Sequence, residues 1–409
     1  MEAVRLFRSL NRDQRNTFLA CFLGWALDAF DFFLLTFVLV PMAHDFGKSI
    51  AQLSYAITLT LAMRPVGAFI FGLLGDRFGR RIPLMIDIIF YSLMEFLTAF
   101  SPNFTILLVF RALYGIGMGG EWGLGASLAM ETLPTAARGL FSGILQQGYM
   151  FGYLFAAFVY GMVFPFFGWR GLFVVGALPA FLVIFIRARV PESPVWLRKR
   201  STINFWPDLA AVLKQHWLLF LYVILLMTAF NAMSHGTQDQ YQTFLGEQRG
   251  LSVGQRSTIG IIYAVGAICG GVIFGHLSQK FGRRRAIIVA AVCGILLIPL
   301  WVFSPGLTLL VLGGFAMQFM VQGAWGIVPV HLNELSPGQV RGTFPGFAYQ
   351  LGNLFAANTA VIEAKLAVHF RDGAGHPDYG KALALFTLVI FVALIVIAAL
   401  GREQRGKEF

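Results

Sequence analysis

Long apolar segments separated by short polar ones follow one another along the whole sequence. Each segment has about 17 to 25 mostly apolar residues, the length of an α-helix that crosses a hydrocarbon core about 30 Å thick. A β-barrel would instead need strands of about ten residues with strict alternation. The pattern therefore predicts twelve membrane-spanning helices, at residues 17–41, 53–75, 82–100, 104–131, 138–163, 169–188, 217–245, 254–276, 285–303, 306–333, 339–368 and 379–401.

The composition also indicates a membrane protein. Apolar residues make up 57% of the 409 residues and charged residues only 12%, about half the charged share of a soluble domain. The cysteines Cys21, Cys269 and Cys293 all fall inside predicted helices. They form neither a disulfide framework nor a metal-ligand spacing, so we expect no metal and no cofactor.

Most of the cations lie in loops on alternate sides of successive helices. They follow the second, sixth and eighth helices and flank both ends of the chain, so the net charge of +11 predicts topology and no nucleic-acid partner. By the positive-inside rule, both termini lie in the cytoplasm, and the protein crosses the inner (plasma) membrane many times. The apolar run after the N-terminal arginines is too long for a secretory signal, so we expect the first helix to be retained.

The two halves of the chain resemble each other at a fixed offset of 203 residues. The matched segments are Gly72–Arg81 with Gly275–Arg284, Glu131–Gly139 with Glu334–Gly342, and Trp122 with Trp325. Parallel repeats of six helices predict two related halves, 1–188 and 217–409, with the substrate site between them. We expect a cytoplasmic linker at 189–216.

Three segments resemble the major facilitator superfamily: Gly72–Arg81 after the second helix, Arg111–Glu121 in the fourth, and Pro191–Leu197 after the sixth. The resemblance implies an all-α membrane protein with the major facilitator fold, in which twelve transmembrane helices form two six-helix halves around a central cavity. It also implies a cytoplasmic latch that favours the outward-open state, formed by Asp76, Arg77, Arg80, Glu131, Arg138, Glu334 and Arg341. Gln279 has no charge at the position equivalent to Asp76, so we expect the second latch to be weaker.

A polar stripe runs along the seventh predicted helix. Its members recur at helical spacing on one face: Asn231, Ser234, His235, Gln238, Asp239 and Gln242. Because each unsatisfied polar group in lipid costs several kcal/mol, this face lines either a wet cavity or a polar contact between helices. His235 and Asp239 are titratable groups one turn apart, which favours the cavity.

The stripe resembles a signature of the Jen-type lactate and pyruvate permeases, Asn-x-x-Ser/Thr-His-x-Ser/Thr-Gln-Asp-x-x-x-Thr, at every position from Asn231 to Thr243. Those carriers belong to the sialate:proton symporter family. The resemblance implies a proton-coupled carboxylate carrier, and it places Gln350 and Asn353 in the substrate path. Tyr149 and Gln147 in the fifth helix are further candidates, since Gln147 matches Gln350 at the repeat offset.

Arg64 lies near the middle of the second predicted helix. A guanidinium in the membrane requires an anion, and its planar fork matches a carboxylate at two points. The anion is either the substrate or a permanent partner, Asp28 or Asp31. Asp28, Asp31 and Glu121 could each carry a proton, although His235 and Asp239 are our first candidates for that role.

The sequence therefore predicts secondary active transport of a small monocarboxylate, lactate or pyruvate, together with a proton, by a monomer in the lipid bilayer. Carriage of sialic acid or another organic acid is the alternative, and a membrane sensor that does not transport is a more distant one. Neither a nucleotide-binding loop nor a nucleophile–base pair can be assembled from the chain, so we expect no enzyme.

Overall fold

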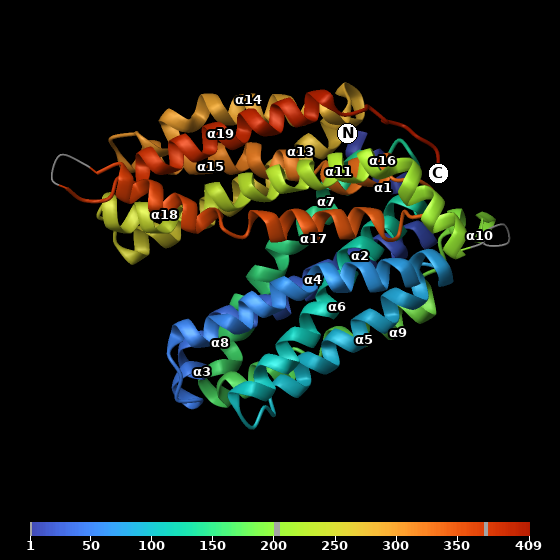
Figure 1. Cartoon of the computed structure of the whole chain (residues 1–409), viewed down its shortest axis with the longest axis horizontal. Coiled ribbons are helices and arrows are strands. Elements are labelled where there is room, and N and C mark those ends of the chain that lie inside the picture. The colour runs from blue at the N-terminus through green and yellow to red at the C-terminus, as the bar shows by residue number, and fades with distance from the viewer. Residues whose placement is uncertain (1, 200–204, 372–374) are drawn as a thin grey trace.

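The structure, a computed structural model, describes residues 2–199, 205–371 and 375–409. Helices account for almost all of these residues, and the described ranges contain no strand beyond an isolated bridge between Arg371 and Pro377. Figure 1 shows two groups of helices that meet at one end and diverge toward the other. Both termini lie where the groups meet, which we call the closed end, and we call the opposite end the far end.

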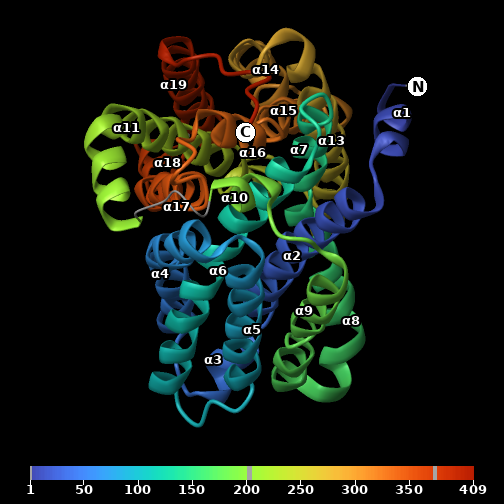
Figure 2. The same cartoon turned by 90° about the vertical axis from the view of Figure 1, so that its right-hand side faces the viewer.

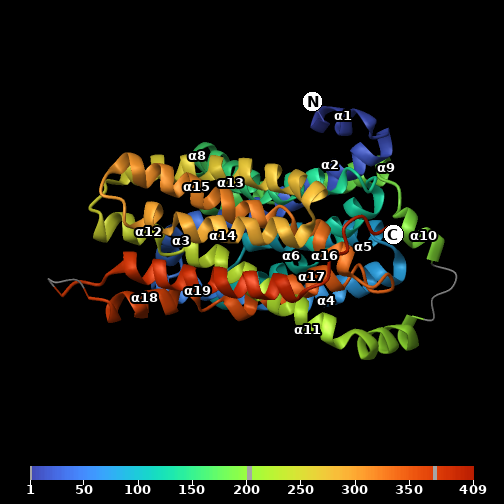
Figure 3. The ribbon, with the colours of Figure 1, turned by 90° about the horizontal axis from the view of Figure 1, so that it is seen from above.

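The helices of the N-terminal part are α1 (Glu2–Ser9), α2 (Arg12–Phe37), α3 (Leu39–Asp45), α4 (Ile50–Phe78), α5 (Arg81–Thr98), α6 (Phe104–Thr132), α7 (Arg138–Gln146), α8 (Gly148–Val175) and α9 (Pro179–Arg189). The short helix α10 (Pro194–Lys199) follows at the closed end (Figure 2). The C-terminal part contains α11 (Phe205–Gln238), α12 (Tyr241–Thr243), the π-helix η1 (Phe244–Gln248), α13 (Val253–Phe281), α14 (Arg283–Val302), α15 (Leu307–Trp325), α16 (Val328–Leu335), α17 (Phe344–Ala356), α18 (Thr359–His369) and α19 (Tyr379–Leu400). In Figure 3 most of these helices run along the axis that joins the two ends.

These helices make twelve passes between the two ends, as the sequence predicts. Nine described stretches are long and apolar enough to cross a membrane. One of them, Arg138–Arg189, contains two passes, because the chain reverses at Gly168, where φ is 61°. Two further passes are α5, which carries three charged residues, and the pair α17 and α18, which are each short. Twelve passes in two groups of helices, as we expected, are therefore present among the described residues.

Several passes differ from the uninterrupted helices that we predicted. Six passes are each divided, the first at Val38, the fifth at Gln147, the sixth at Gly176–Leu178, the seventh at Asp239–Gln240, the tenth at Gly326–Ile327 and the eleventh at Ala357–Asn358. Proline contributes to these breaks: Pro179 is the first residue of α9 and Pro329 is the second residue of α16, in the first turn, where a missing N–H costs little. The linker expected at 189–216 contains α10 and the start of α11, which bends at His216; its residues 200–204 lie outside the described ranges.

The sequence repeat extends to the way helices begin and end. Ser49 and Gln52 form a capping box at the start of α4, and Ser252 and Gln255 form the equivalent box at the start of α13. Both helices end at a glycine with positive φ, Gly79 at 94° and its counterpart Gly282 at 99°. A side chain at either position would be strained, so glycine fixes the turn into the next helix.

Glycines allow the two groups to approach closely at the closed end. A Cβ atom at Gly143 of α7 would lie 2.3 Å from the carbonyl oxygen of Gly271 in α13. Likewise, Gly123 of α6 and Gly346 of α17 face each other, and a Cβ on either would lie 2.9 Å from the other's Cα. The backbones therefore pack directly against each other, as small residues permit in membrane helices.

Candidate functional site

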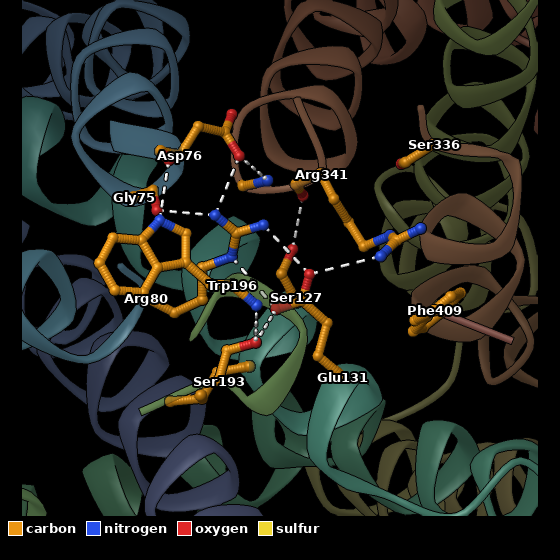
Figure 4. A network of polar contacts seen from close by, with 12 residues as sticks. Gly75, Asp76, Arg80, Ser127, Glu131, Ser193, Trp196, Ser336, Arg341 and Phe409 are labelled. Atoms are coloured by element: carbon orange, nitrogen blue, oxygen red, sulfur yellow. Dashed lines mark hydrogen bonds and ion pairs between the residues drawn. The ribbon is translucent and has the colours of Figure 1, made fainter. Parts of the chain in front are cut away.

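A network of polar contacts joins the two groups at the closed end (Figure 4). Asp76, near the end of α4, accepts hydrogen bonds from the backbone N–H groups of Gly342 (2.7 Å) and Thr343 (3.0 Å) and from the hydroxyl of Thr343 (2.7 Å). The two donor residues directly precede α17 in the other group. Because Asp76 is buried, water competes little for these bonds. Asp76 therefore fastens α4 to the start of α17.

Arg80 lies at the centre of this network. Its guanidinium donates to both oxygens of Glu131, at 3.2 and 3.0 Å, and to Oδ1 of Asp76 at 3.0 Å. The hydroxyl of Ser193 donates to Glu131 at 2.5 Å, and the ring nitrogen of Trp196 donates to the backbone carbonyl of Asp76 at 3.0 Å. The segment after α9 therefore packs onto the network and completes it.

Glu192 of the same segment accepts hydrogen bonds at the start of α5. Its donors are the backbone N–H groups of Arg80 (2.8 Å), Arg81 (3.1 Å) and Ser193 (2.7 Å). Burial raises the pKa of Glu192, while these N–H groups and the charge of Arg80 act in the opposite direction. The carboxylate holds the segment after α9 against the first turn of α5.

The C-terminal group repeats the central ion pair. Arg283 of α14 donates to both oxygens of Glu334, at 2.9 and 3.0 Å, as Arg80 does to Glu131 at the equivalent positions. Gln279 takes the position of Asp76, and its side-chain oxygen accepts from Arg283 at 2.6 Å.

The other expected latch residues have different surroundings. Arg341 Nη1 lies 3.5 Å from Glu131 across the two groups, and the guanidinium lies 3.9 Å from the ring centroid of Phe409. Arg138 also lies over Phe409, at 3.8 Å. Arg77 is exposed, and its guanidinium lies 5.1 Å from the ring centroid of the neighbouring Phe78.

Some residues of the polar stripe of α11 form hydrogen bonds within or between helices, whereas others are exposed. Asn231 donates to the carbonyl of Met227 in its own helix at 2.8 Å. Gln238 donates to Ser234 at 2.9 Å and to Gln318 of α15 at 3.3 Å. Gln238 therefore holds α11 against α15, which is one of the two interpretations open at the sequence level, whereas Asn231 is bonded within its own helix.

His235 and Asp239 belong to the more exposed part of the stripe. His235 Nδ1 lies 3.1 Å from Asp239 Oδ2, and His235 Nε2 lies 3.2 Å from the side-chain oxygen of Asn353 in α17. Both side chains of the pair are 36% exposed; His235 lies in the last turn of α11, and Asp239 directly follows the helix. The pair is therefore accessible, and Asn353 of the C-terminal group contacts its histidine.

Arg64 has no anionic partner among the described residues. Its side chain is 3% exposed, it forms no ion pair with a described carboxylate, and its Nε and Nη2 atoms are buried without a hydrogen-bond partner. The guanidinium lies 6.0 Å from the ring centroid of Tyr349, a weak cation–π contact. Neither Asp28 nor Asp31 is thus its permanent partner in this structure.

The three acids that we proposed as proton carriers are fully buried. Asp28, Asp31 and Glu121 are each 0% exposed, and none of their carboxyl oxygens has a hydrogen-bond partner among the described residues. Glu121 lies against α2, because a Cβ atom on Gly24 would be 2.3 Å from its Oε1 atom. These acids face the interior of the N-terminal group.

Sequence reasoning missed two further acids of this interior. Glu95 of α5 forms a fully buried ion pair with Arg111 of α6, and Asp87 of α5 is buried without a hydrogen-bond partner. The available signal was their position inside predicted helices, where an ionisable residue by itself suggests function.

The remaining candidates are less accessible than expected. Gln147 and Gln350 are both 1% exposed with unpartnered side-chain amides, and Gln147 is pressed against Gly271 of α13. Tyr149 packs between Trp25 and Phe33, with ring centroids 5.5 and 5.1 Å away. Gln147 therefore contacts the opposite group of helices.

A bundle of membrane-length helices in two repeated groups, closed at one end and carrying accessible polar groups toward the other, is the architecture of a transporter. Residues 21–357 match the family described as Major Facilitator Superfamily, and the chain belongs to that superfamily.

The chain is similar to transporters of organic acids. It is 30% identical over 433 aligned positions to the carboxylic acid transporter protein homolog of Saccharomyces cerevisiae, and the alignment covers 98% of this chain and 70% of that protein. The sialic acid transporter NanX of Escherichia coli is 28% identical, with 100% and 98% covered. A solved structure of the proton:xylose symporter XylE has a TM-score of 0.76 at 19% identity, covering 97% of each chain, which shows the shared fold.

Proposed function

We propose that this protein is a secondary active transporter that carries a small monocarboxylate, lactate or pyruvate, together with a proton across the inner membrane. The observation that carries the proposal is Arg64, a buried guanidinium whose Nε and Nη2 atoms have no partner. A planar donor pair of this kind matches the two oxygens of a carboxylate. Similarity to a carboxylic acid transporter over most of both chains supports an organic acid as the substrate.

The proposed cycle is alternating access. With both termini in the cytoplasm, the closed end faces the cytoplasm, and the Asp76–Arg80–Glu131 network holds it shut while the far end is open to the outside. Closure of the far end and release of the network would then expose the site to the cytoplasm. Release has an energetic cost, because the network is buried and bridges both groups.

A sialic acid carrier is the second candidate. It is favoured by similarity to a sialic acid transporter over the full length of both chains. A sugar acid has several hydroxyl groups, which the amides and hydroxyls of Ser234, Gln238 and Asn353 could bind.

Uptake into liposomes that contain purified protein distinguishes these candidates. An inward-directed pH gradient is imposed, and accumulation of lactate, pyruvate, sialic acid and xylose is compared. Uphill lactate or pyruvate uptake that an uncoupler abolishes is the expected result. Sialic acid uptake without lactate or pyruvate uptake would select the second candidate, and uptake of xylose alone would refute a carboxylate carrier.

A further inference from the structure

The segment after the last helix, residues 401–409, lies at the closed end, and we call it the tail (Figure 1). Its first part is bound to the C-terminal group. Glu403 accepts a hydrogen bond from the backbone N–H of Arg284 at 3.1 Å, and the N–H of Gly406 donates to Oε1 of Glu334 at 3.2 Å. Helices α14 and α16 therefore fix the course of the tail as far as Gly406.

The start of the tail repeats a contact of the N-terminal group. Glu192, after the sixth pass, accepts from backbone N–H groups at the start of α5, and Glu403, after the twelfth pass, does the same at the start of α14. A Cβ atom on Gly79 would lie 2.3 Å from a carboxyl oxygen of Glu192, and one on Gly282 would lie 2.8 Å from a carboxyl oxygen of Glu403. The tail is therefore seated in a defined position that has an equivalent in the other half.

Beyond Gly406 the tail crosses to the N-terminal half of the chain. Arg138, the first residue of α7, donates from Nη1 to the backbone carbonyl of Lys407 at 2.8 Å. Arg198 of α10, in the segment that packs onto the network, donates from Nη2 to the backbone carbonyl of Phe409 at 2.7 Å. The tail thus forms hydrogen bonds with both halves at the end where they meet.

The ring of Phe409 contacts cations from both halves. Its centroid lies 3.8 Å from the guanidinium of Arg138 and 3.9 Å from that of Arg341, and Figure 4 shows Phe409 next to the side chain of Arg341. These arginines occupy equivalent positions of the repeat and are 5% and 1% exposed. Two buried cations repel each other, whereas the face of an aromatic ring attracts each of them. The ring therefore favours the arrangement in which both arginines lie close to it.

We propose that the tail is a strap that holds the closed end shut, with the ring of Phe409 as a clamp between the two halves. Opening of this end moves Arg138 away from Arg341, because the two belong to different halves. The ring can then contact only one of them. The hydrogen bonds of the tail described above involve neither Asp76 nor Arg80, so the strap adds to the stability that the network gives. This holds whichever acid the protein carries.

Distances between spin labels at Ile82 and Leu218, exposed residues of the two groups near the closed end, test the strap in purified protein without substrate. Phe409→Leu keeps an apolar side chain but has no aromatic face, so the ratio of open to closed molecules rises about tenfold. Phe409→Trp carries the ring that binds cations best and keeps the wild-type distances. Glu408→Ala, a change at an exposed neighbour, is the matched control and has no effect.

Identical distance distributions in Phe409→Leu and in wild type would overturn the inference. A shift of the same size in Phe409→Trp or in Glu408→Ala would also overturn it, because the aromatic face would then be irrelevant.

Hydrogen exchange adds a measurement on the unmodified protein. The N–H of Gly406 is bonded to Glu334, so it exchanges more slowly than the same group in a free peptide of residues 401–409. Exchange at the rate of the free peptide would overturn the inference, whether or not the variants fold. Neither measurement contains a substrate, so failure of the strap and failure of the proposed function are separate results.

Discussion

Replacing Asp76 by asparagine tests whether the closed-end network sets the balance between the two open states. The carboxylate accepts three hydrogen bonds from Gly342 and Thr343, on both of its oxygens. Asparagine keeps one acceptor oxygen and puts an NH₂ group in place of the other. In either orientation of the amide, that group faces a backbone N–H donor and cannot accept from it.

The size of the effect follows from these contacts. A hydrogen bond to a charged group contributes about 1.5–3 kcal/mol. The substitution removes the negative charge and one of the two acceptor oxygens. We therefore expect the state closed at this end to lose about 3 kcal/mol of stability, which changes the equilibrium between the two open states about 100-fold. Gln279→Asp, at the equivalent position of the second repeat, changes the balance less, because no cross-group bonds depend on a charge there.

Distances between spin labels on a cysteine-free background measure the shift. One label pair joins Ile82 and Phe281 at the closed end, and another joins Val40 and Val368 at the far end; all four side chains are exposed. In Asp76→Asn we expect the first distance to lengthen and the second to shorten in a large fraction of molecules. Distributions identical to wild type at both pairs would refute a latch function for Asp76.

Three further substitutions are informative. Arg64→Lys keeps the charge but loses the two-point grip, so we expect carboxylate affinity to fall about tenfold or more with an unchanged melting temperature; wild-type affinity would exclude Arg64 as the anion site. Glu95→Gln leaves the buried guanidinium of Arg111 unpaired, which should cost about 3–5 kcal/mol of stability and lower the melting temperature in detergent; an unchanged melting temperature would contradict this. Gly143→Ala places a methyl group against α13, so we expect the closed end to open more often and the label distance there to lengthen, whereas Gly161→Ala, which meets open space, should have no effect.

The sequence predicted the fold well because lipid imposes strong rules. A membrane helix must be long and apolar, and a repeated loop motif marks the same turn in both halves. The breaks within passes were not predictable from hydropathy. The break at Gly326–Ile327, between α15 and α16, for example, contains no charged or polar side chain. They depend on prolines and on packing between helices, which a window of mean hydropathy does not detect.

The candidate site was predictable where a motif or helical spacing carried the information. Asp76, Arg80 and Glu131 could be placed from the repeated loop, and the contact between His235 and Asp239 follows from their spacing of four residues. That Arg64 forms no ion pair with Asp28 or Asp31 could not be derived, because it depends on how α2 and α4 are placed relative to each other. Glu95 and Asp87 were overlooked for a similar reason: which face of α5 is buried is decided by α6 and α9.

The two halves differ in the charged residues at equivalent positions of the repeat. At the offset of 203 residues, each ionisable group of the N-terminal interior meets a residue without a charge: Asp28 with Asn231, Asp31 with Ser234, Arg64 with Ala267, Asp87 with Ala290, Glu95 with Ile298, Arg111 with Gly314, and Glu121 with Ala324. The closed-end ion pairs, in contrast, are present in both halves. The closed-end contacts thus follow the symmetry of the fold, whereas these seven buried charges of the N-terminal group have no charged counterpart at the equivalent positions of the other half.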